Sequence, residues 1–143
     1  TLHVIYPMHP NPAVSEAARA VLGDCAQALL LPPLDVKDLH NLMQRCTLVM
    51  TDSGGLQEEA PSLHKPVLVL RTETERQEVV ACGAARLVGV AEDAVYAQAK
   101  MLLADGEAYR TMAQAGNPYG DGQAAGRIVE AICAWDTQGR PVA

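Results

Sequence analysis

One short stretch of the chain carries residue types that could bind an anion. Residues 51–61 read TDSGGLQEEAP and follow the apolar run TLVM, which has the length and composition of a buried strand. A strand that turns through Ser53, Gly54 and Gly55 into a helix directs free N–H groups and the positive end of the helix dipole at one point. The pattern predicts a phosphate site, although a tight turn between strand and helix would use the same residues.

Two acidic residues follow this turn. Glu58 and Glu59 are adjacent, so on a helix their side chains point about 100° apart and only one can face a given ligand. A carboxylate is a natural acceptor for two neighbouring hydroxyls, such as a ribose diol. The residues alone do not distinguish such a role from that of two solvated glutamates on a surface helix.

Two basic side chains could also contact phosphate. His9 lies in the proline-rich loop MHPNP after the first apolar run, and in parallel α/β sheets ligands bind beyond the carboxyl ends of the strands. Arg76 lies near an expected helix start and could pair with a diphosphate. The alternatives are a solvated loop histidine and a surface salt bridge from Arg76 to Glu73 or Glu78.

Strand-length apolar runs alternate along the chain with segments of helical spacing. The runs predict strands at 2–6, 28–31, 47–50, 67–70 and 85–89. The spacing predicts helices within 15–22 and 34–43, a helix that begins directly after the Ser-Gly-Gly turn, and helices within 75–82, 92–104, 107–115 and 123–135. Asp38 is the expected N-cap of the second helix, and Thr74 with Gln77 forms an expected capping box at the fourth.

This alternation predicts an α/β protein with a Rossmann-like, doubly wound parallel sheet that helices cover on both faces. The length of 143 residues suits one domain, placed at 1–135, with a polar tail at 136–143. Aromatic residues total only 3%, so the core must be built from Ala, Val and Leu.

Composition argues against several classes of partner. The net charge is −6 with no basic stripe, which disfavours nucleic acid, and no apolar run approaches the ~20 residues of a membrane helix. The first residues lack the basic region of a signal peptide. The four cysteines are scattered, which predicts buried, reduced thiols in a cytoplasmic protein and no zinc site.

Longer strings of residues resemble a known family. DSGGLQEEAPSLHKPVLV at 52–69, with PMHPNP at 7–12, TER at 74–76 and NPYGDG at 117–122, closely resembles the non-hydrolysing UDP-N-acetylglucosamine 2-epimerases. The resemblance covers nearly the whole chain. It implies the two-domain GT-B fold, in a protein roughly twice this length, of which this chain would be the carboxyl-terminal, UDP-binding half.

The resemblance also implies roles for individual residues. Backbone groups in the segment from Leu34 to Leu39 would lie beside the uracil, and Glu59 would bind the ribose. Ser53, Gly54, Gly55 and Arg76 would hold the diphosphate, and His9 would help to bind a second, regulatory substrate molecule. A family glycine and a family proline are replaced here by His64 and Gln77, and His64 would be strained if that glycine has a positive φ.

In the resembled enzymes UDP is eliminated across C1–C2 of the sugar and then added back, which interconverts UDP-GlcNAc and UDP-ManNAc without a cofactor or metal. The proton-transfer carboxylates of the family lie in the amino-terminal half, so we expect no catalytic residue in this chain and no activity from it alone. Full-length members of the family are commonly homodimers. The alternatives are the nucleotide-sugar half of a GT-B glycosyltransferase and a non-catalytic UDP-sugar-binding regulatory module.

Overall fold

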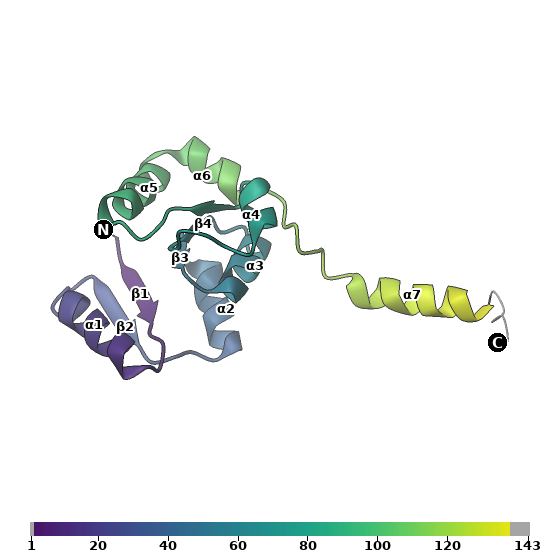
Figure 1. Cartoon of the computed structure of the whole chain (residues 1–143), viewed down its shortest axis with the longest axis horizontal. Coiled ribbons are helices and arrows are strands. Elements are labelled where there is room, and N and C mark those ends of the chain that lie inside the picture. Colours follow the sequence, from purple (N-terminus) through teal and green to yellow (C-terminus); the bar gives the residue numbers. More distant parts are fainter. Residues whose placement is uncertain (1, 138–143) are drawn as a thin grey trace. The chain divides into compact units, whose positions relative to one another are not determined.

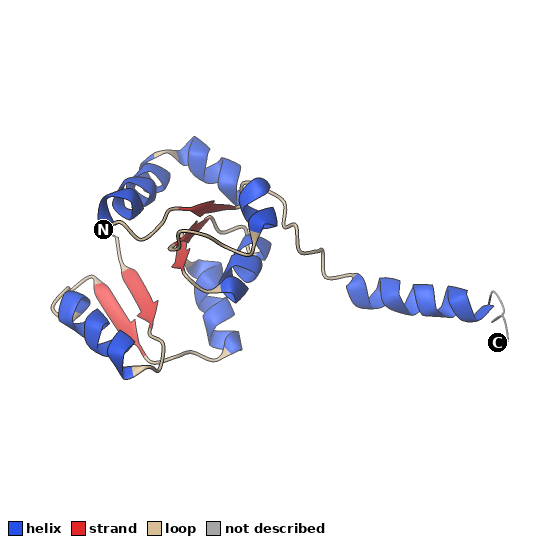
Figure 2. Cartoon of the chain, in the orientation of Figure 1, coloured by secondary structure: helices blue, strands red, loops and turns tan. Residues whose placement is uncertain are grey.

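The computed structural model describes residues 2–137 of the chain (Figure 1). The chain divides between Arg45 and Cys46 into two compact units. In each unit parallel strands are joined through helices, which confirms the predicted α/β class (Figure 2). The described strands pair as two parallel sheets, one in each unit. The proposed boundary between a 1–135 domain and a tail stays a prediction, because residues 138–143 lie outside the described part.

The first unit is a strand–helix–strand motif followed by a second helix. Its elements are β1 (Val4–Pro7), α1 (Pro12–Leu22), β2 (Ala28–Leu31) and α2 (Val36–Arg45). β1 and β2 are parallel, with Val4 opposite Ala28. The side chain of Asn11 caps α1 by accepting from the N–H of Ala13 at 3.0 Å, and Pro12 occupies the first helical position, where its missing N–H costs nothing.

The cap of α2 differs from the sequence prediction. The carboxylate of Asp35 accepts from the N–H of Asp38 at 2.8 Å, so Asp35 satisfies the helix start and Asp38 lies inside the first turn. Two aspartates three residues apart are both plausible caps by residue type. The prediction of Asp38 was wrong because only the backbone geometry decides which carboxylate precedes the first turn.

The second unit contains a three-stranded parallel sheet with β4 at its centre. Its elements are β3 (Val49–Thr51), α3 (Gly54–Ser62), β4 (Val67–Val69), α4 (Gln77–Ala81), β5 (Ala85–Leu87), α5 (Glu92–Ala104), α6 (Gly106–Ala113) and α7 (Ala124–Thr137). All three residues of β4 are fully buried. Figure 1 shows α3 on one side of β4 and α5 with α6 on the other, so helices cover both faces of this sheet.

Leucine, valine and alanine side chains together with methionine build the core of this unit, so the core predicted from the low aromatic content is confirmed except for methionine. Leu68 of β4, Leu102 of α5 and Met112 of α6 are buried together, and Leu48 and Val88 pack against them. The burial of apolar side chains therefore holds α5 and α6 against the sheet. Such burial stabilises a fold by roughly 25 cal/mol per Å² of apolar surface removed from water. The rigid β4 strand is what fixes the loops at the carboxyl edge of the sheet.

The cysteines and α4 require two further corrections. All four cysteines are free thiols, but Cys25, Cys82 and Cys133 are exposed and only Cys46 is half-buried, so their predicted burial was wrong.

The helix expected at 75–82 begins at Gln77. The Gln77 side chain donates to the carbonyl of Thr74 instead of accepting from the Thr74 N–H, so no capping box forms.

The end of α3 bears out the expectation for His64. This residue has φ of 56°, and it is the one non-glycine residue with positive φ among those that the structure describes. Its N–H donates to the carbonyl of Pro61 at 3.0 Å and closes the last turn. Its ring Nδ1 lies 3.2 Å from the carbonyl oxygen of Ala113, a contact that glycine could not make.

Within residues 2–137 no helix has both the length and the apolar character needed to cross a bilayer. The side chains of α7 are exposed over 124–135, including those of Ile128, Ile132 and Trp135.

Candidate functional site

The corner between β3 and α3 has the geometry of an anion site. Ser53 is the N-cap of α3 in an extended conformation, and its side chain makes no capping hydrogen bond. The first bond into the helix runs from the N–H of Gln57 to the carbonyl of Ser53 at 3.4 Å. The amides of residues 54–56 precede that bond and lack partners within the helix, so they point outward with the positive end of the dipole. This is the arrangement predicted for Ser53, Gly54 and Gly55.

A carboxylate lies beside each glycine, and the one at Gly54 leaves no room for a side chain. A Cβ atom at Gly54 would lie 2.8 Å from Oε1 of Glu75, a separation that real Cβ atoms essentially never show. A Cβ atom at Gly55 would lie 3.5 Å from Oε1 of Glu59 and 3.9 Å from Oγ of Ser53. The missing side chain of Gly54 therefore creates the space in which an acceptor oxygen reaches the start of the helix, whereas the Glu59 oxygen near Gly55 lies at an ordinary contact distance.

The adjacent glutamates take different directions, as the helix geometry requires. Nε of Arg76 donates to Oε1 of Glu58, so Glu58 is the partner of that arginine. Glu59 is half-buried and directs its carboxylate back toward Gly55 at the first turn, not into the core. The orientation of Glu59 is compatible with the ribose-binding role that the resemblance implied, which stays a prediction.

Arg76 connects the loop before α4 to α3. Its guanidinium pairs with Glu58 and lies 3.7 Å from Oε1 of Glu75. The sequence offered Glu73 or Glu78 as surface partners, and the described structure pairs Arg76 with neither. The hydrogen bond that Arg76 donates to Glu58 raises the pKa of Arg76, and burial partly opposes this shift. Arg76 is thus a permanent positive charge at the start of α3, with about a third of its side chain exposed.

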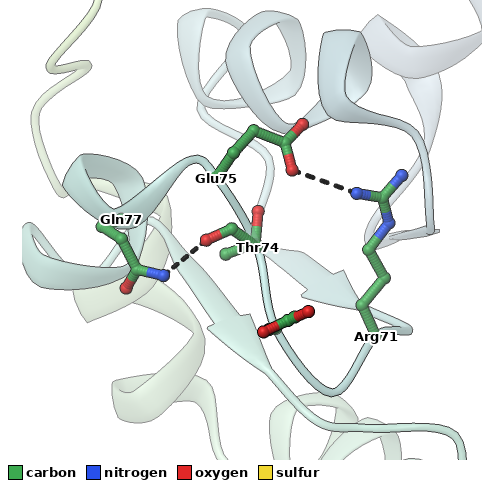
Figure 3. A pocket seen from close by; sticks show the side chains of 5 residues that line it. Arg71, Thr74, Glu75 and Gln77 are labelled. Carbon is green, nitrogen blue, oxygen red and sulfur yellow. Dashed lines mark hydrogen bonds and ion pairs between the residues drawn. The ribbon is translucent and has the colours of Figure 1, made fainter.

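The loop 71–77 forms a shallow hollow of about 390 Å³ beside this corner (Figure 3). Arg71, Glu73, Thr74, Glu75 and Gln77 line it. Nη1 of Arg71 lies 3.1 Å from Oε2 of Glu75, and Figure 3 shows these two side chains meeting across the hollow. Sequence reasoning missed both residues, and their spacing of four was the one signal that could have paired them.

A buried hydrogen bond holds this loop against α3. The hydroxyl of Thr74 donates to Oε1 of Gln57 at 2.7 Å, and both side chains are almost fully buried. The Thr74 hydroxyl also accepts from the N–H of Arg76 at 3.1 Å. Because buried polar groups must keep their partners, these bonds fix the backbone from which Glu75 and Arg76 extend.

The other predicted residues belong to the first unit. Leu34 and Leu39 are half-buried, and the N–H of Leu39 is engaged with the carbonyl of Asp35 at 2.9 Å. His9 is exposed, and its Nδ1 accepts from the N–H of Asn11 at 3.2 Å, which leaves Nε2 as the ring atom for an outside partner. The structure thus brings together the predicted residues between Ser53 and Arg76, whereas His9, Leu34 and Leu39 lie in the unit before Cys46.

Among the described residues no group of three His, Cys, Asp or Glu side chains could hold a metal ion. The corner instead offers amides, a hydroxyl and two arginines, which suit an anion. Its carboxylates can accept hydrogen bonds from hydroxyl groups.

Comparison with known proteins decides the family. The sequence profile described as UDP-N-acetylglucosamine 2-epimerase matches residues 1–133. The chain belongs to the UDP-N-acetylglucosamine 2-epimerase family. The match confirms the family resemblance that the sequence motifs indicated. The family is named after a substrate with a nucleoside diphosphate group, and the corner at the start of α3 has the geometry of an anion site.

Curated relatives agree with this assignment. The chain is 52% identical to the UDP-N-acetylglucosamine 2-epimerase of Bacillus subtilis over 131 residues, which are 92% of this chain and 34% of that protein. It is 47% identical to the enzyme of the same name from Escherichia coli O157:H7, again over 92% of this chain and 35% of the relative. The chain therefore spans about a third of the length of these relatives, where the resemblance led us to expect half.

Solved structures of the family share the fold. A structure of S. aureus MnaA with UDP superposes with a TM-score of 0.89 at 46% identity, over 98% of this chain and 39% of that one. The UDP-GlcNAc 2-epimerase of Neisseria meningitidis, bound to UDP-GlcNAc, gives a TM-score of 0.86 at 39% identity, over 92% and 36%. The arrangement of strands and helices is thus that of the 2-epimerases.

Proposed function

We propose that this chain is the carboxyl-terminal, UDP-binding part of an enzyme that interconverts UDP-GlcNAc and UDP-ManNAc. The observation that carries the proposal is the uncapped start of α3, where outward amides, two glycines and Arg76 converge. Support comes from solved relatives, whose structures hold UDP or UDP-GlcNAc.

Each residue has a role in this proposal. The amides after Ser53, its hydroxyl and Arg76 hold the diphosphate, and Glu59 accepts hydrogen bonds from the ribose diol. Backbone groups between Leu34 and Leu39 read the uracil, and His9 contributes to a second, regulatory substrate site. In the full protein this chain acts with an amino-terminal domain, as a homodimer in the cytoplasm.

The chemistry explains why such a corner is needed. When the bond between the sugar C1 and the diphosphate breaks, negative charge develops on the leaving oxygen. Preorganised amides and a fixed guanidinium stabilise that charge without reorganising, and they hold UDP in place for its return to C1. The groups that move the C2 proton lie outside this chain, so its own residues bind and stabilise the leaving group.

The proposal predicts which contacts recognise which part of UDP. Arg76→Ala should weaken binding of both UDP and inorganic pyrophosphate by roughly tenfold, since a charged hydrogen bond is worth about 1.5–3 kcal/mol. Glu59→Gln should weaken UDP binding alone, because pyrophosphate has no ribose. Amide shifts in an NMR titration of the ¹⁵N-labelled chain measure both affinities.

Arg127→Ala serves as the control, because Arg127 is an ion-paired arginine outside the corner, bonded to Asp121. The proposal is wrong if UDP fails to shift the amides of Gly54 and Gly55, or if Arg76→Ala and Arg127→Ala have equal effects.

A further inference from the structure

A carboxylate of the protein itself occupies the space over the start of α3. Oε1 of Glu75 comes within 2.8 Å of the position of a Cβ on Gly54, and Nη2 of Arg76 lies 4.0 Å from the same point. Glu75 is 21 positions away in the chain, so the loop before α4 delivers it there. An anionic oxygen therefore lies in the place that the glycines keep open.

The same carboxylate contacts the basic groups of the corner. Oε2 of Glu75 lies 3.1 Å from Nη1 of Arg71, and Oε1 lies 3.7 Å from Nη1 of Arg76. Figure 3 shows the Glu75 side chain turned toward Arg71 above the hollow. The guanidinium of Arg76 and the helix start are also what a diphosphate would contact.

The Glu75 carboxylate is ionised and able to move. The hydrogen bond from its own backbone N–H lowers its pKa most, burial opposes this shift, and the positive charges of Arg71 and Arg76 lower the pKa further. About half of the Glu75 side chain is exposed, and so is 38% of that of Arg71. The backbone beneath is anchored through Thr74 and Gln57. Departure of the carboxylate thus needs only rotation of side chains.

We propose that Glu75 is an internal anion that occupies the diphosphate position of the empty site and leaves it when the nucleotide binds. Glu75 then rotates outward together with Arg71, its ion-pair partner four residues earlier in the chain. Arg76 stays in place and contacts the ligand. This inference rests on the proposed function of the same corner. It makes Glu75 the residue that limits diphosphate affinity and favours release.

The physical consequence is a competition between two anions for one set of donors. Binding of the ligand must break the contacts of Glu75 and place like charges near one another. The reaction proposed above needs the diphosphate to leave the sugar and, at the end, the protein. A competing carboxylate weakens the bound states and so counteracts trapping of UDP.

The test compares Glu75→Gln with Glu78→Gln, using UDP and inorganic pyrophosphate as probes. Both changes remove one negative charge, three positions apart, but Glu78 contacts neither Arg71 nor Arg76 in the described structure. Glu75→Gln should tighten binding of both probes roughly fivefold, the scale of one exposed ion pair. Glu78→Gln should change either affinity by less than about twofold.

A second readout needs no ligand. The amide signal of Gly54 should shift in Glu75→Gln and stay in place in Glu78→Gln, because only the first change removes charge from above that amide. If the chain binds UDP and Arg76→Ala weakens it, but Glu75→Gln binds equally or less well, the internal-anion inference is wrong and the site stands. If no variant binds UDP or pyrophosphate at millimolar concentration, the proposed function fails and this inference fails with it.

Discussion

The first two residues of α3 are glycines, and their lack of side chains shapes the site as much as the neighbouring charged side chains do. Gly54 lies where any Cβ would collide with an oxygen above it, and in this structure that oxygen belongs to Glu75. Glycine at this position weakens a helix slightly relative to alanine. The need to admit a bulky anion explains glycine at this position better than the need for a tight turn does.

We predict that Gly54→Ala separates binding from stability. Because the clashing atom is the end of a flexible side chain, Glu75 can move and the free energy of unfolding should change by less than about 1 kcal/mol. UDP affinity should fall at least roughly tenfold, since the new methyl occupies the path of the diphosphate. Urea denaturation and an NMR titration measure the two effects.

Gly106→Ala provides the matched control. Gly106 is also the first residue of a helix, α6, and its added Cβ would meet only Nη1 of Arg110 at 3.4 Å. That variant should keep its UDP affinity. Equal affinities for the two alanine variants would show that nothing approaches Gly54 during binding.

At the scale of elements, α3 is held at both ends by different means. Its amino end depends on the loop 71–77, tied down through the buried bond between Thr74 and Gln57. Its carboxyl end depends on His64, which accepts a left-handed backbone conformation and gains a contact with Ala113 in return. The site is thus built on a helix whose direction is fixed on both sides, which keeps its amides aimed at one point.

The strain at His64 can be measured. His64→Ala loses the contact with Ala113 and keeps the unfavourable φ, so it should lower the free energy of unfolding by about 1 kcal/mol. His64→Gly loses the same contact but relieves the backbone, so it should be more stable than His64→Ala by about 1 kcal/mol. Urea denaturation of the three proteins gives the order, and an alanine variant as stable as the glycine variant would contradict the strain.

At the scale of the whole molecule, the chain covers about a third of the length of its curated relatives. The carboxylates at the corner are engaged: Glu58 with Arg76 and Glu75 with both arginines. A net charge of −6 also opposes a dianionic ligand, so binding must come from local contacts.

We therefore predict that the 143-residue chain alone does not epimerise UDP-GlcNAc. Incubation with the nucleotide sugar, followed by chromatography, should yield neither UDP-ManNAc nor free UDP, because the proposed function places the groups that move the C2 proton outside this chain. A full-length relative in the same assay shows that the conditions support turnover. Formation of either product by the chain would mean that it contains catalytic groups that we have not identified.

Much of this protein follows from short stretches of its sequence. Apolar runs placed β2 and β4 almost to the residue, helical spacing placed α5 at 92–104, and Ser-Gly-Gly marked the start of α3. These features depend on residues within one or two turns of each other, so local preference is enough to predict them. Local preference was not enough at the start of α2, because Asp35 and Asp38 are the same residue type three positions apart and either could cap the helix.

Only the tertiary structure decided which distant side chains meet. Glu75 reaches Gly54, Arg76 reaches Glu58, and Thr74 bonds to Gln57 across 17 positions, because β4 carries the chain back to the same edge of the sheet. Apart from its spacing of four from Arg71, nothing local to Glu75 distinguishes it from Glu73 or Glu78. Its position above an open helix start is a consequence of parallel strands, which bring their carboxyl ends together whatever their separation in the chain.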